Sequence, residues 1–96
     1  MESLHTPETD SLFEALLGLT TVEECYAFFE DLCTIRELRD LSQRFAVARM
    51  LAAGRSYQEI SQATGASTAT ICRVNKCLLY GTGGYRRAVG GGEETK

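Results

Sequence analysis

Histidine and paired cysteines, from which most metal centres are built, are scarce in this 96-residue chain. His5 is its only histidine, and its four cysteines include no C-x-x-C pair, so we expect no metal and no cofactor. No apolar run approaches the roughly 20 residues that cross a bilayer. No glycine loop follows a strand pattern, so a phosphate-binding loop is not indicated. These absences disfavour an enzyme and a membrane protein.

Features of secretion are also lacking. The first residues, MESLHTPETD, are acidic and polar, which is unlike a signal peptide. We therefore expect a cytoplasmic protein whose thiols stay reduced, with Cys25 and Cys33 half buried.

The apolar residues take helical spacing throughout, and the alternation typical of strands is absent. Thr6 with Pro7 marks one helix start, and three capping boxes mark others: Thr21 to Glu24, Thr34 to Glu37 and Ser56 to Glu59. The sequence predicts an all-α fold with five helices and room for a sixth over residues 85–89. The core stripe predicted for the longest helix is Ile35, Leu38, Leu41, Phe45, Ala48 and Leu51.

The chain divides into four functional segments. Residues 1–55 are predicted to hold dimerisation helices, 56–80 a reading head, 81–89 a loop with a short helix, and 90–96 a flexible tail. Dimerisation is expected because a chain this short buries a limited core by itself. The apolar positions that one subunit is expected to leave uncovered are Leu12, Leu16, Phe29, Leu32, Val47 and Met50.

The short helices predicted over 57–64 and 67–80 flank Gly65, which is the layout of a helix-turn-helix. In the second helix, the residues expected to pack inward are Ile71, Val74 and Leu78. Small residues and cations on the other side suit entry into a major groove. The residues predicted to bind double-stranded DNA are Ser56, Gln58, Ser67, Thr68, Ala69, Cys72, Arg73 and Lys76. The alternative is an ordinary helical hairpin with a solvated polar face.

The net charge of −3 conceals an uneven distribution. Residues 1–40 carry ten acidic and two basic side chains, a net charge of −8, whereas residues 41–90 carry seven basic and one acidic, a net charge of +6. This distribution favours a polyanion as partner of the C-terminal half. A charge split without any partner is the alternative.

The run LCTIRELRDLSQRFAVARMLAAGRSYQEISQATGASTATICRVNKCL (32–78) resembles the core of the Trp repressor. The run YGTGGYRRAV (80–89) resembles the YerC/YecD-type branch of that superfamily. The resemblance implies an intertwined, all-helical homodimer with six helices per subunit and two protruding reading heads.

The resemblance also implies a corepressor pocket, in which Thr34, Arg44, Thr70 and Arg73 match the family pattern. Val74 replaces a glycine of that pattern and Cys77 replaces a serine. The valine would fill the ligand's space, and a thiol is a weak partner for an ammonium group. We therefore expect no response to tryptophan. A small anionic effector between the two arginines is an alternative to a pocket that is packed shut.

Together these features predict a sequence-specific DNA-binding transcriptional regulator. Repression by occupying the site is the mode of regulation that we favour. The alternative is a protein-interaction module with a vestigial helix-turn-helix. Arg86 and Arg87 are interpreted either as backbone clamps or as solvated charges.

Overall fold

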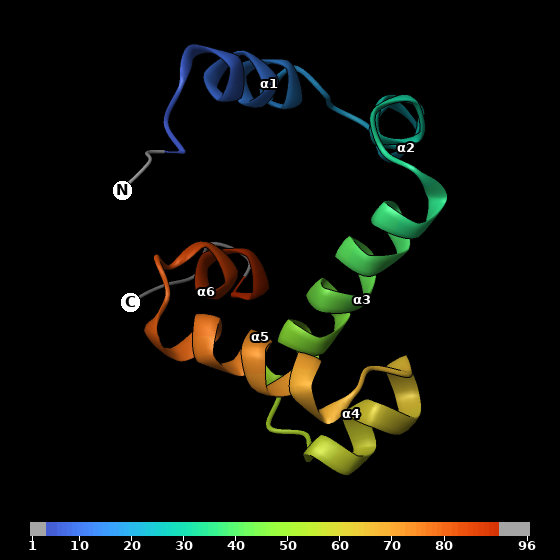
Figure 1. Cartoon of the computed structure of the whole chain (residues 1–96), viewed down its shortest axis with the longest axis vertical. Helices are drawn as coiled ribbons and strands as arrows, with labels where there is room; N and C mark the ends of the chain where they lie inside the picture. Colours follow the sequence, from blue (N-terminus) through green and yellow to red (C-terminus); the bar gives the residue numbers. More distant parts are fainter. Residues whose placement is uncertain (1–3, 91–96) are drawn as a thin grey trace. The chain divides into compact units, whose positions relative to one another are not determined.

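The structure is a computed structural model that describes residues 4–90. All the regular structure in this part of the chain is helical (Figure 1). The six helices are α1 (Pro7–Leu17), α2 (Val22–Leu32), α3 (Ile35–Ala52), α4 (Tyr57–Thr64), α5 (Thr68–Tyr80) and α6 (Gly84–Val89). The all-α prediction is confirmed, and the sixth helix is present. The predicted tail lies outside the described residues except for Gly90.

Local side-chain chemistry sets the helix starts. The hydroxyl of Ser56 accepts from the backbone N–H of Glu59 at 3.1 Å, and the Glu59 carboxylate accepts from the N–H of Ser56 at 3.0 Å. Thr34 and Glu37 form the same reciprocal pair, at 3.1 and 2.8 Å.

The box predicted for α2 forms only in half. The Thr21 hydroxyl accepts from the N–H of Glu24, but the Glu24 carboxylate turns one residue further back. It accepts from the N–H of Thr20 at 2.8 Å and from the Thr20 hydroxyl at 3.2 Å. Thr20 thus offers the carboxylate two donors, its backbone N–H and its hydroxyl, in place of the single backbone donor of a capping box.

Two compact units divide the chain, Met1–Leu38 and Arg39–Lys96. The division falls inside α3, upstream of the functional division predicted at residue 55, which stays a prediction. In the first unit, α1 and α2 bury no residue at all. Of the apolar residues predicted to await a partner here, Leu32 is exposed, and Leu12, Leu16 and Phe29 are only partly buried.

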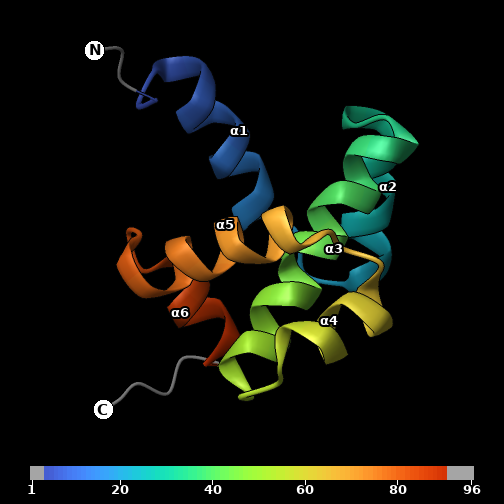
Figure 2. The same ribbon diagram turned by 60° about the horizontal axis from the view of Figure 1, so that its bottom comes forward.

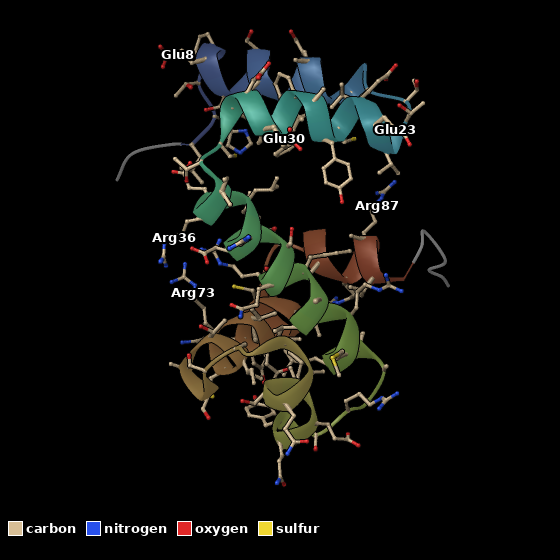
Figure 3. The ribbon with its side chains drawn as sticks, turned by 90° about the vertical axis from the view of Figure 1, so that its right-hand side faces the viewer. Glu8, Glu23, Glu30, Arg36, Arg73 and Arg87 are labelled. Carbon is tan, nitrogen blue, oxygen red and sulfur yellow. The ribbon has the colours of Figure 1, made fainter. Side chains whose placement is uncertain are left out.

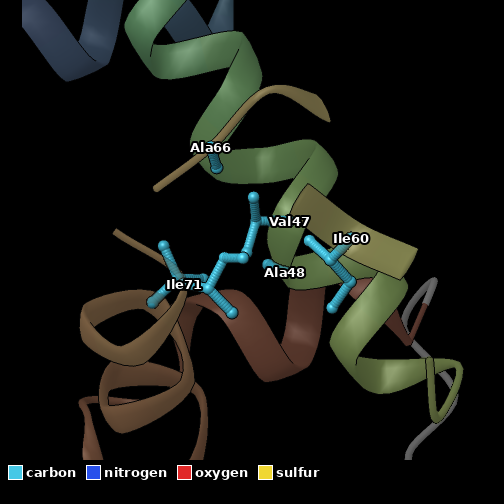
Figure 4. Packing of buried hydrophobic residues seen from close by; sticks show 6 residues of the cluster. Val47, Ala48, Ile60, Ala66 and Ile71 are labelled. Carbon is cyan, nitrogen blue, oxygen red and sulfur yellow. The ribbon is translucent and has the colours of Figure 1, made fainter. Parts of the chain in front are cut away.

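The second unit holds the hydrophobic core, where α3, α4 and α5 meet (Figure 4). Val47, Ala48, Ile60 and Ile71 are fully buried there. α5 contacts both α4 and α6 (Figures 1 and 2). Burial of an aliphatic side chain of this size stabilises the fold by about 1.5–3 kcal/mol, so these few side chains fix α4 and α5 against the long helix.

The core stripe predicted for α3 is wrong at three of its six positions, while Leu38 and Leu51 are partly buried. Ile35 is 74% exposed, and Leu41 and Phe45 are exposed as well. Ala48 is buried as predicted, but its fully buried neighbour is Val47. The helix carries apolar residues around more than one face, and packing against α4 and α5 selects the face of Val47.

This choice of face also corrects two predictions about exposure. Val47 is not left for a partner, since it is part of the subunit's own core, and Met50 packs partly against that core.

Cys25 is exposed rather than half buried, whereas Cys33 is partly buried as predicted. Within residues 4–90, no helix is both long and apolar enough to cross a membrane.

Candidate nucleic-acid interface

The turn between α4 and α5 is held by a compact set of hydrogen bonds. Gly65 takes a left-handed conformation with φ of 76°, which a residue without Cβ adopts at little cost. The Ser61 hydroxyl donates to the carbonyl of Ala66 at 3.0 Å, and the Thr64 hydroxyl accepts from the N–H of Ala66 at 3.1 Å. The turn therefore enters α5 in a fixed direction.

Gln43 ties this turn to the long helix. Its Nε2 donates to the carbonyl of Thr64 at 3.1 Å, a residue 21 positions away in the chain. The last carbonyls of a helix have no partner within the helix, so this bond satisfies one of them. No local pattern in the sequence indicates such a tie.

The two sides of α5 differ as the sequence predicts. Ile71, Val74 and Leu78 are buried. On the remaining surface, Thr68, Ala69, Cys72, Arg73 and Lys76 are exposed. Arg73 extends outward from α5 (Figure 3). The inward prediction is confirmed, and the cations are free to meet a ligand outside the subunit.

The remaining DNA-binding candidates lie at helix starts. Ser56 and Ser67 are exposed, but each hydroxyl accepts from the third residue of its helix, at 3.1 Å in both cases. Gln58 is exposed in the first turn of α4. The two serines therefore shape the helix starts before they can offer anything to a ligand.

A second contact in this region was also not predicted from the sequence. The Nδ2 of Asn75 donates to the Oη of Tyr57 at 3.2 Å, which joins the first residue of α4 to the middle of α5. The sequence indicates only that Asn75 lies on the same side of α5 as Cys72 and Thr68, which precede it by three and seven residues.

The residues of the implied effector pocket differ in burial and in the compact unit to which they belong. Val74 is 2% exposed and belongs to the core, while Arg44, Arg73 and Cys77 are exposed. The Thr70 hydroxyl lies 3.2 Å from that of Ser67. Thr34 belongs to the other compact unit, where it caps α3.

Arg86 holds the C-terminal end of α5. Its guanidinium donates to the carbonyls of Leu78 at 3.2 Å and Leu79 at 3.0 Å, the last turn of α5. A cation at a helix C-terminus is also favoured by the helix dipole. Arg86 is thus a clamp on the protein's own backbone, whereas Arg87 is exposed.

Charge separates between the two units. Residues 1–38 carry nine acidic and one basic side chain, a net charge of −8, and residues 39–90 carry eight basic and two acidic, a net charge of +6. Glu8, Glu23 and Glu30 lie on α1 and α2 (Figure 3). Hydrogen bonds donated by Thr20 hold the pKa of Glu24 below its ordinary value.

Comparisons with known proteins agree with this geometry. A family profile described as Trp repressor protein matches residues 7–91. The chain is 50% identical to the uncharacterized protein YerC of Bacillus subtilis (strain 168), over 100% of this chain and 92% of that protein.

Solved structures are similar along nearly the whole chain. A crystal structure of a TrpR-like protein from Eubacterium eligens superposes with a TM-score of 0.88 at 51% identity, covering 96% of this chain and 97% of that one. A candidate Trp repressor from Staphylococcus aureus gives a TM-score of 0.88 at 46% identity, covering 97% and 94%. With its all-helical fold and this extent of similarity, the chain belongs to the Trp repressor protein family.

Proposed function

We propose that this protein is a sequence-specific DNA-binding transcriptional regulator that represses by occupying its site. One observation carries the proposal. The buried side of α5 is anchored in the core, so its other side is presented with Arg73 and Lys76 exposed. The net charge of +6 over residues 39–90 adds the attraction for phosphates that all DNA binding needs.

A homodimer is part of the proposal. Helices as short as α1 and α2, with 11 residues each, are marginal in water unless an apolar face is covered. Phe13 and Val22 are more than half exposed, as is Leu17, which is 85% exposed. A second copy that interlocks through these helices would cover them, and it would pair two reading heads about 34 Å apart, one turn of DNA.

We also propose that tryptophan does not switch this regulator. Val74 stands where the family pattern has a glycine, and its side chain is buried in the core. Cys77 offers a thiol where the pattern has a hydroxyl. The pose of α5 is then set by packing rather than by a ligand. A small anion that bridges Arg44 and Arg73 is an outcome that the effector tests below would detect.

Selection of bound duplexes from a random DNA pool tests the function. We expect enrichment of a two-fold symmetric site and a steep fall of log affinity with log salt concentration. Repeating the selection with each amino acid tests the effector. Retention of no DNA at low salt, together with capture of a partner by α1 and α2, would instead support a protein-interaction module.

A further inference from the structure

We propose that Tyr57, oriented by Asn75, donates a hydrogen bond to a backbone phosphate of the bound DNA. The inference rests on the proposed DNA-binding function and adds two residues to its interface. It begins from the bond of 3.2 Å between the Nδ2 of Asn75 and the Oη of Tyr57, which are 18 positions apart in the chain.

The phenol of Tyr57 keeps one unused function in this arrangement. A phenolic oxygen can accept and donate at once, and here it accepts from an amide N–H. No other hydrogen bond of this phenol forms among residues 4–90, so its proton is available for an external acceptor. Because Asn75 holds the oxygen and the ring is anchored in α4, the direction of that proton is restricted before DNA arrives.

The pair lies on the side of α5 that carries two of the predicted DNA-binding residues, Thr68 and Cys72. Thr68, Cys72 and Asn75 follow at intervals of four and three, which places them on one side of a helix. Seven residues at about 1.5 Å each separate Thr68 from Asn75 by roughly 10 Å along the axis. The major groove is about 12 Å wide.

This placement determines which DNA atoms the hydroxyl of Tyr57 would meet. With the N-terminal end of α5 in the groove, the proposal places the phenol of Tyr57 beside the strand that borders the groove. The acceptors on that border are phosphate oxygens, to which neutral tyrosine hydroxyls commonly donate.

A salt series with the selected duplex tests the assignment. Tyr57→Phe should lower affinity by roughly 10-fold, the usual effect of one hydrogen bond to a charged group. The slope of log affinity against log salt should stay at the wild-type value, because a neutral phenol displaces no counterion. Loss of a cation would lower that slope instead. Tyr26→Phe, a change at an exposed tyrosine of α2, is the matched control and should bind like the wild type.

Asn75 should act only through Tyr57. We expect Asn75→Ala to weaken binding by a smaller factor, and the double variant to bind no worse than Tyr57→Phe. Melting curves of all variants check that the fold is kept. A scan of single methylphosphonate substitutions then locates the acceptor, at one position where Tyr57→Phe loses less affinity than the wild type.

The outcomes separate this inference from the proposed function. If the wild type retains no DNA, the DNA-binding proposal itself is wrong. If the wild type binds and Tyr57→Phe binds equally well, only the phosphate contact is overturned. Additive losses for Tyr57 and Asn75 would overturn the positioning role of Asn75.

Discussion

Arg73 and Lys76 illustrate what single residues contribute to this protein. Both are exposed on α5, one or two positions from the buried Val74. Their charges are therefore presented to a ligand while the packing beneath them is provided by other side chains. Their removal should act on binding without creating a cavity.

We expect Arg73→Ala and Lys76→Ala each to weaken DNA binding with the fold intact. Each loss of a phosphate contact should lower the salt slope by roughly one unit. Arg49→Ala is the matched control, since it removes one charge from the same unit on the helix side away from Val47 and Ala48. Equal affinity of wild type and both α5 variants across the salt series would show that another face meets DNA.

Glu24 gives a prediction about pH. Its pKa is held below the ordinary value of 4.5 by hydrogen bonds from the backbone and side chain of Thr20. Because the folded pKa is lowered, the stabilisation by this carboxylate is present above 4.5 and is lost as the pH falls through the lowered value. A carboxyl NMR titration should place the Glu24 midpoint below 4.5, and a midpoint at or above 4.5 would contradict the contact with Thr20.

At the scale of the elements, the C-terminal end of α5 is held by Arg86 and by a close backbone approach at Gly81. The carbonyls of its last turn are satisfied by Arg86, and the chain leaves the helix at Gly81. A Cβ at position 81 would collide with the carbonyl oxygen of Cys77. Gly81 is therefore required for close approach and not for an unusual φ.

Gly81→Ala should destabilise the protein by roughly 1–3 kcal/mol, as overpacking does in a tight contact. Gly84→Ala is its control, because a Cβ at the start of α6 meets nothing within 4 Å and φ is not positive there. We expect that variant to be neutral or more stable by about 0.4–1 kcal/mol. Urea denaturation of both measures the difference, and equal stabilities would refute the predicted collision.

For the whole molecule, the uncovered helices α1 and α2 predict a dimer. Light scattering at micromolar concentration should give twice the mass of the 10.5 kDa chain. Leu17→Glu would place a charge on this apolar surface and should shift the mass towards the monomer, because an unpaired charge is costly to bury. A monomeric mass for the wild type would contradict the assembly proposed here.

Insensitivity to tryptophan is also a property of the whole regulator. Calorimetric titration with tryptophan should show no binding at micromolar strength, since Val74 and Cys77 together are expected to cost about 2–4 kcal/mol, or some 30- to 1000-fold in affinity. The double change Val74→Gly with Cys77→Ser should restore a response if it keeps the fold. Micromolar binding by the wild type, with tighter DNA binding, would refute this prediction.

The sequence by itself determined where helices begin and end and which side of α5 faces inward. Helix caps such as Ser56 with Glu59 act within four residues, so their outcome does not depend on distant packing. Gly65 at a positive φ and the burial of Ile71 follow from equally local constraints. The exposed side of α5 could be predicted from the sequence because it is the complement of that buried side, and its role in binding DNA stays a prediction.

Only the tertiary structure decided which face of α3 is buried and which distant residues meet. The helix offers more than one apolar face, and contact with α4 and α5 selects Val47 over the neighbouring Phe45. The bonds of Gln43 to Thr64 and of Asn75 to Tyr57 span 21 and 18 positions. Such pairs depend on how helices cross, and that crossing is fixed by the fit of side chains in the core, which no local spacing encodes.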